Sequence, residues 1–237
     1  MNLPLPAQDQ DWPSAARASA LARPLWTAAG LAAMLLLLSL GQDIYVYGWP
    51  HGTLPDSKLM FDVDHEKSFY TWLSSTLLFA CAVLLIWIAH EEQRVGGALH
   101  AYWRLLATVF VLLSADEHVG VHERASEWLS IHLPTHGLLY YGWVMLAAPL
   151  CLAGGMVSLR ALKVLDRPIR QRLFLSATVF VLGAIGVEML SAAFAEVHGQ
   201  ANLSYHLMAN LEEGLEGAGV LLFLFGLDRY RRGLAAR

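Results

Sequence analysis

Residues 173–195 read LFLSATVFVLGAIGVEMLSAAFA, and Glu188 is the only ionisable residue among them. An α-helix rises about 1.5 Å per residue, so this stretch is long enough to cross a hydrocarbon core of about 30 Å. A segment of this length and hydrophobicity is typical of a transmembrane helix. Because a carboxylate is costly to hold within a membrane and is usually retained for function, Glu188 also marks a candidate functional position.

Five further segments have the same apolar character. The predicted spans are 24–44, 69–90, 103–123, 138–158, 173–195 and 206–227. Of all residues, 56% are hydrophobic and 15% are charged, whereas a soluble domain is about half apolar and about a quarter charged. We therefore expect an all-α fold, a polytopic membrane helix bundle with about six transmembrane helices, whose outer surface contacts the lipid bilayer.

Composition also argues against several classes of protein. The formal net charge is −4, and no stretch of the chain is basic enough to suggest nucleic acid as a partner. The two cysteines, Cys81 and Cys151, both lie inside predicted spans, which argues against a disulfide framework and a cysteine-based zinc site. The composition thus points to a membrane protein whose chemistry depends on other side chains.

Basic residues are distributed unevenly between the predicted connections. They gather between the fourth and fifth spans and after the sixth, at Arg160, Lys163, Arg167, Arg170, Arg172, Arg229, Arg231, Arg232 and Arg237, whereas the connection 198–205 has none. Basic connections stay on the cytoplasmic side of a membrane. We therefore expect a cytoplasmic N-terminal tail at 1–23, a transmembrane domain at 24–228 and a basic cytoplasmic tail at 229–237. The connection 43–68 would then lie outside.

Three glutamates on different predicted spans fall at one depth in the membrane. With the expected orientation, Glu117, Glu188 and Glu213 each lie roughly 10 Å below the outer end of their helix, at about 1.5 Å per residue. A charge at the membrane centre costs about 2.5–3.5 kcal/mol even on insertion scales. Three such groups at one depth would burden insertion unless they are paired, protonated or bound to a cation, so they predict a buried polar site.

Helical spacing groups these side chains further. His118 and His122 are four residues apart, so a continuous helix would place them on one face, as two ligands of one metal require. The short connection 198–205 makes the last two spans antiparallel neighbours, so Glu188 would face the glutamates at 212–216. Imidazole and carboxylate together favour a divalent zinc, iron or manganese ion over Cu(I). The predicted ligands are Glu117, His118, His122, Glu188, Glu213 and Glu216.

The predicted site leaves three functions open. In the first, it is a metal site near the outer face that serves a metal-dependent membrane enzyme, with Glu213 as general base for a metal-bound water. In the second, the carboxylates relay protons or ions, although the inner halves of the predicted spans carry few matching charges. In the third, the chain is an accessory subunit bound to other membrane subunits, and the cluster stabilises the bundle through shared protons.

Other polar residues have a simpler interpretation. Residues 61–66, FDVDHE, are interpreted as a solvated acidic loop, with capping of the site as the alternative. We therefore expect Glu66→Ala to change metal content and thermal stability little. Four further residues lie near the predicted ends of spans, where polar groups cost little, so each taken alone fits an interfacial position: His122, Glu123, His198 and His206.

Several motifs resemble those of an uncharacterised family of small bacterial multi-pass inner-membrane proteins. They are FDVDHE at 61–66, TWLSS at 71–75, ADE at 115–117 followed by HE at 122–123, Glu188, and EE at 212–213 followed by Glu216. The resemblance covers about 25–230 and implies a location in the bacterial inner (cytoplasmic) membrane. It supports the topology and the acidic positions and implies no reaction.

A looser similarity is to the membrane hydrolases that include alkaline ceramidases, whose zinc site uses histidines, an aspartate and a serine. It implies that Asp116, His118 and His122 hold zinc, with Ser74 or Ser75 as a further polar group. The order of these elements differs from that of the hydrolases, and a seventh span is lacking, which puts this assignment in doubt.

Overall fold

The computed structural model describes residues 21–49 and 60–234, and the regular elements within these ranges are helical. The α-helices are α1 (Ala22–Gly48), α2 (Phe69–Arg94), α3 (His100–Val119), α4 (Val121–His132), α5 (Val144–Ala161), α6 (Arg167–Val181), α7 (Glu188–His198) and α8 (Leu203–Leu234). Two 3-10 turns, η2 (Gly137–Leu139) and η3 (Leu162–Val164), and a π-helical turn, η4 (Leu182–Val187), complete the chain. Most of the expected tail 1–23 lies outside the described residues.

Several helices are long and apolar enough to cross a membrane. Four segments meet this condition: α1, α2, α5 with η3 (Val144–Val164), and α6 to α7 (Arg167–His198). The pair α3 and α4 would make a fifth, although the two are bent by 72°. α8 is equally long, but its three glutamates interrupt the apolar sequence. The structure therefore supports a helical membrane bundle, with four or five crossings by length and composition against the expected six.

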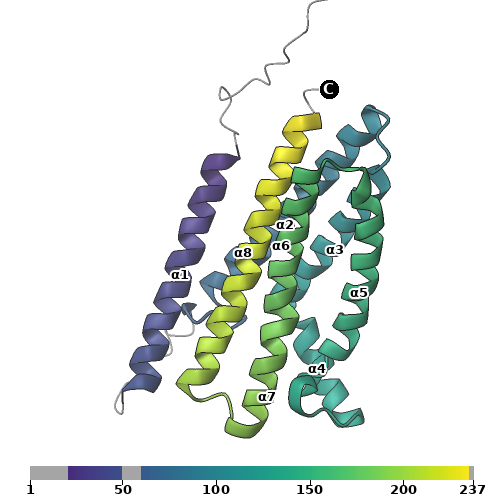
Figure 1. Cartoon of the computed structure of the whole chain (residues 1–237). Helices are drawn as coiled ribbons and strands as arrows, with labels where there is room; N and C mark the ends of the chain where they lie inside the picture. The colour runs from purple at the N-terminus through teal and green to yellow at the C-terminus, as the bar shows by residue number, and fades with distance from the viewer. Residues whose placement is uncertain (1–20, 50–59, 235–237) are drawn as a thin grey trace, which may run out of the picture.

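α8 lies at the centre of the bundle (Figure 1). It packs along α6 and α1 and also contacts α2, while α2 packs along α3. The start of α1 and the end of α8 lie together at what we call the terminal end of the bundle, and α4 and the connection from α7 to α8 lie at the opposite, pocket end. Both ends of the described chain thus lie at the same end of the bundle.

The third predicted span is interrupted, which corrects one expectation. α3 ends at Val119 because Gly120 adopts a left-handed conformation, with φ of +64°. A Cβ atom at this position would collide with the carboxylate of Glu66, so glycine also allows a close approach of the preceding loop. His118 and His122 consequently belong to different helices, and the shared helical face predicted from their spacing is wrong.

The fifth predicted span, in contrast, continues through its glycines as one long helical segment. The π-helical turn Leu182–Val187 joins α6 to α7 directly before Glu188. A Cβ atom at Gly183 would lie 2.8 Å from the backbone oxygen of Glu212, so the missing side chain lets this turn approach α8 closely. Turns of this kind are frequent at functional sites, and here the turn sets the register of Glu188 against α8.

Candidate functional site

An open pocket of about 160 Å³ lies at the pocket end of the bundle, and we call it the acidic pocket. Its carboxylates are Asp64, Glu66, Glu117, Glu123, Glu188, Glu212 and Glu213, and its other polar side chains include His122, Tyr141, Trp143, Gln200 and Tyr205. None of the lining residues that the structure describes is a lysine or an arginine. Seven carboxylates from five segments therefore face a shared space with no lysine or arginine, and one histidine, among those lining residues.

Two of these carboxylates meet across α7 and α8. The side chains of Glu188 and Glu212 both line the acidic pocket and lie close enough to interact directly. The indole Nε1 of Trp143 donates to Glu188 Oε1 at 2.8 Å, and Ser191 Oγ donates to Glu212 Oε2 at 3.5 Å. Two carboxyl groups in such contact must share a proton or hold a cation between them. The expectation that Glu188 faces the glutamates of the last helix is therefore confirmed.

The corner between α3 and α4 orients His122. Asp116 accepts a hydrogen bond from the backbone N–H of His122 at 2.9 Å and another from its ring Nδ1 at 2.9 Å. The Trp143 ring lies 5.2 Å from the imidazole. A carboxylate that binds one ring nitrogen fixes the tautomer of the histidine and directs the other nitrogen outward, as in many metal sites. Nε2 of His122 is thus the ring nitrogen that can bind a ligand in the pocket.

The six predicted ligands divide into two groups. Glu117, His122, Glu188 and Glu213 line the acidic pocket. His118 is exposed on the last turn of α3 and does not line it, and Glu216 lies next to Gly183 rather than among the lining residues. The structure therefore brings four of the predicted residues together. Of the zinc ligands that the hydrolase similarity implies, Asp116 and His122 contact each other, whereas His118 does not line the pocket.

The acidic loop at 61–66 forms one wall of the pocket, in line with the capping alternative, while Asp64 also stays exposed to solvent. Asp64 and Glu66 both line the pocket, and Tyr205 Oη donates to Asp64 Oδ1 at 3.5 Å. Desolvation by the surrounding protein, followed by the nearby Asp62 carboxylate, raises the pKa of Asp64 to about 7, although part of its side chain stays accessible. The alternation of acidic residues in FDVDHE was the signal for this wall.

Three polar side chains at the rim were also missed by sequence analysis. Gln200 Nε2 donates to Tyr141 Oη at 2.7 Å and to Tyr205 Oη at 3.3 Å. These residues come from the connection before α5, the connection before α8 and the first turn of α8. Their hydrogen bonds link α8 to Asp64, so the rim is built by contacts between segments that no local sequence pattern indicates.

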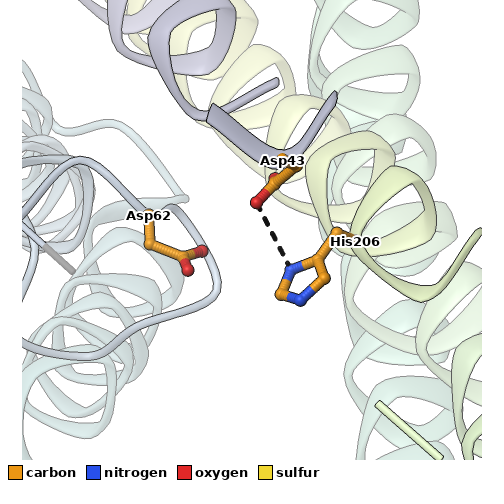
Figure 2. A group of neighbouring side chains, drawn as sticks. All are labelled: Asp43, Asp62 and His206. Carbon is orange, nitrogen blue, oxygen red and sulfur yellow. Dashed lines mark ion pairs between the residues drawn. The ribbon is translucent and has the colours of Figure 1, made fainter. Parts of the chain in front are cut away.

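A second group of ionisable side chains lies beside the pocket and is fully enclosed. Asp43 of α1, Asp62 of the acidic loop and His206 of α8 each place a potential ligand atom within 4.8 Å of the others (Figure 2). Their exposed fractions are 0%, 5% and 7%. His206 Nδ1 lies 3.7 Å from Asp43 Oδ1, and the Tyr47 ring stacks on the imidazole at 4.4 Å. His206 is therefore enclosed by protein, and its expected depth near the membrane interface stays a prediction.

Comparison with curated proteins and with solved structures finds no match. One family model does match, over residues 30–230, a range that contains the acidic pocket and the enclosed group of Asp43, Asp62 and His206. The chain therefore belongs to the family described as a domain of unknown function, DUF8692, which agrees with the resemblance to an uncharacterised family.

Proposed function

We propose that this chain is a multi-pass membrane protein that binds a divalent cation in the acidic pocket. The observation that carries the proposal is the convergence of seven carboxylates on one open pocket, with no lysine or arginine among its described lining residues. Like charges at this range force some carboxyl groups to be protonated unless a cation is present. A bound cation would allow them to remain ionised together.

The centre of the proposed site is the contact between Glu188 and Glu212, with His122 and Glu117 as further candidate ligands. The Glu188 and Glu212 carboxylates interact directly in the pocket, so one ion could take the place of a proton shared between them. Carboxylate oxygens with one imidazole suit a divalent manganese, iron or zinc ion. Glu213 lines the same pocket and is our candidate general base for a metal-dependent membrane enzyme, in which the metal would activate a bound water.

The decisive experiment measures bound metal in the detergent-purified, full-length protein. After chelation and dialysis against Mn²⁺, we expect Glu188→Gln/Glu212→Gln to lose one bound Mn²⁺ per chain, because the two amides cannot supply anionic ligands. Glu127→Gln is the matched control, since Glu127 is exposed on α4 and does not line the pocket. Equal Mn²⁺ content in the double variant and the unsubstituted protein would refute the proposal and favour the accessory-subunit interpretation.

We further propose six crossings, with α8 as the last, and cytoplasmic termini in a bacterial inner membrane. The support is the position of both described chain ends at the terminal end, together with the basic residues between α5 and α6. A cysteine placed at Ser204 should react with an impermeant reagent from outside the cell. Because Cys151 is exposed and Cys81 is buried, the Cys151→Ala background removes the competing thiol. Labelling only from the cytoplasmic side would reverse this topology.

Proton or ion translocation is a second candidate, favoured by buried carboxylates at both ends of the bundle. Glu92 of α2 and Asp228 of α8 are buried at the terminal end. Both residues lie just beyond the predicted spans 69–90 and 206–227, so the sequence does not indicate that they are buried. The buried residues of α8 between the two ends are apolar, as at Val220, Phe223 and Leu224, so the structure favours a binding site over a continuous relay.

A further inference from the structure

We propose that Asp43, Asp62 and His206 form a second, structural divalent-metal site, separate from the acidic pocket. This inference goes beyond the proposed function and does not depend on it. None of the three residues lines the pocket, and all three are buried. They come from α1, from the loop before α2 and from α8, so an ion held by them would fasten three segments together (Figure 2).

The positions of the donor atoms fit a metal after a small contraction. The potential ligand atoms lie within 4.8 Å of one another. Donors bound to a tetrahedral zinc at about 2.1 Å are about 3.4 Å apart. Rotations that move the side chains by about 1 Å would therefore close the site, with no helix displaced.

The surroundings orient two of the three side chains, Asp43 and His206. Asn210 Nδ2 donates to Asp43 Oδ2 at 2.9 Å and to the backbone oxygen of His206 at 2.9 Å. The stacked Tyr47 ring fixes the plane of the His206 imidazole. Partners that orient the first ligands in this way are a regular part of metal sites.

The Asn210 amide supplies a second indication of a ligand. Its Oδ1 atom is buried and accepts no hydrogen bond from the residues that the structure describes. This oxygen belongs to the same amide that contacts Asp43, so it is a candidate fourth donor beside the three ligands. A buried oxygen without a partner costs free energy, and coordination to a cation would remove that cost.

The character of the site suggests which ion it holds and what the ion does. One imidazole and two carboxylates favour zinc, manganese or ferrous iron over soft metals. A closed site without an open position is typical of structural zinc. Asp62 is followed directly by the buried Val63, whose N–H donates to the buried Ser39 Oγ of α1 at 3.2 Å. The ion would thus fix the loop that carries Asp64 and Glu66 into the pocket.

Zinc stoichiometry in the full-length protein, with Zn²⁺ as the only added metal, tests this site. We expect either His206→Gln or Asp43→Asn to bind one Zn²⁺ per chain fewer than the unsubstituted protein, whether or not the acidic pocket also holds zinc. His198→Gln is the matched control, because His198 is an exposed histidine at the same end of the bundle. His206→Gln with unchanged zinc content would overturn the inference and leave a proton-bridged Asp–His–Asp group in its place.

The two proposals fail separately in this design. If only His206→Gln loses one Zn²⁺, the enclosed site is supported and the metal site in the acidic pocket is refuted. If only Glu188→Gln/Glu212→Gln loses one Zn²⁺, the enclosed site alone is refuted. If the His206 and Asp43 variants do not fold, the variant Glu188→Gln/Glu212→Gln/His122→Ala still tests the enclosed site, because it lacks ligands in the acidic pocket and keeps Asp43, Asp62 and His206. X-ray absorption of its remaining zinc should show one imidazole nitrogen among oxygen ligands, and either a shell of oxygens alone or no bound zinc would overturn the inference.

Discussion

Carboxylates gather at both ends of this bundle, but their burial and surroundings differ. At the terminal end, Asp228 is buried between Arg231 and Arg232, with N–O distances of 3.3 Å to each. Glu92 accepts hydrogen bonds from the Tyr230 hydroxyl and from the Leu99 backbone N–H. At the pocket end, by contrast, seven carboxylates face one another across an open space.

This difference distinguishes the polar groups of the terminal end, which stabilise the fold, from those of the acidic pocket, which can form a binding site. A buried charge that has its partners within the fold needs nothing from outside, whereas like charges in excess require protons or cations. The Arg231 guanidinium also lies 4.7 Å above the Trp87 ring, so the terminal end is closed by its own aromatic and basic residues. The comparison therefore predicts opposite responses to substitution at the two ends.

The largest expected effect is at the terminal end. Asp228→Ala should lower the free energy of unfolding by about 3 kcal/mol, because it leaves Arg231, whose side chain is only 17% exposed, without its carboxylate partner. The partial exposure of Arg232 places this cost near the lower end of the range for buried pairs. The loss should be the same with and without divalent metal, as measured by denaturation in detergent. A loss that appeared only with metal present would show that the two ends are coupled.

At the pocket end, Glu212→Gln should have an effect that depends on metal. In chelated protein it should leave stability unchanged or raise it, because one of several like charges is removed. In Mn²⁺ at about one hundred times the dissociation constant, the unsubstituted protein should gain about 2.7 kcal/mol by linkage, and the variant should gain less. Thermal unfolding with and without Mn²⁺ measures both. Equal Mn²⁺ stabilisation of the two proteins would contradict the assignment of Glu212.

A smaller effect is expected from the contact that positions Glu188. Gly183→Ala would place a methyl group 2.8 Å from the Glu212 backbone oxygen, so the π-helical turn η4 and α8 must separate. Overpacking of this kind costs about 1–3 kcal/mol. We expect lower thermal stability and weaker Mn²⁺ binding together. Gly154→Ala in α5 is the control, since nothing lies within 4 Å of the added Cβ. Unchanged Mn²⁺ binding in Gly183→Ala would show that the spacing is not critical.

Sequence patterns predicted the helices and part of the pocket for a clear physical reason. Apolar runs long enough to span a membrane predicted where the helices lie. The rise per residue predicted that Glu117, Glu188 and Glu213 lie at one depth. The break at Gly120 was missed because a glycine among polar residues near a helix end is tolerated in several conformations. The enclosed group was missed because Asp43, far from His206 in sequence, becomes its neighbour only through helix packing.

The smallest expected effect tests the corrected role of His118. The sequence spacing made His118 and His122 equivalent ligands, but the break at Gly120 leaves His118 exposed and His122 in the pocket. His118→Ala should therefore keep the full Mn²⁺ content and change the free energy of unfolding by less than about 0.5 kcal/mol, as surface substitutions do. His122→Ala should lower Mn²⁺ content, because it removes the only imidazole that lines the pocket among the described residues. Equal losses in both variants would restore the shared-face arrangement and would require α3 to continue through Gly120 when metal binds.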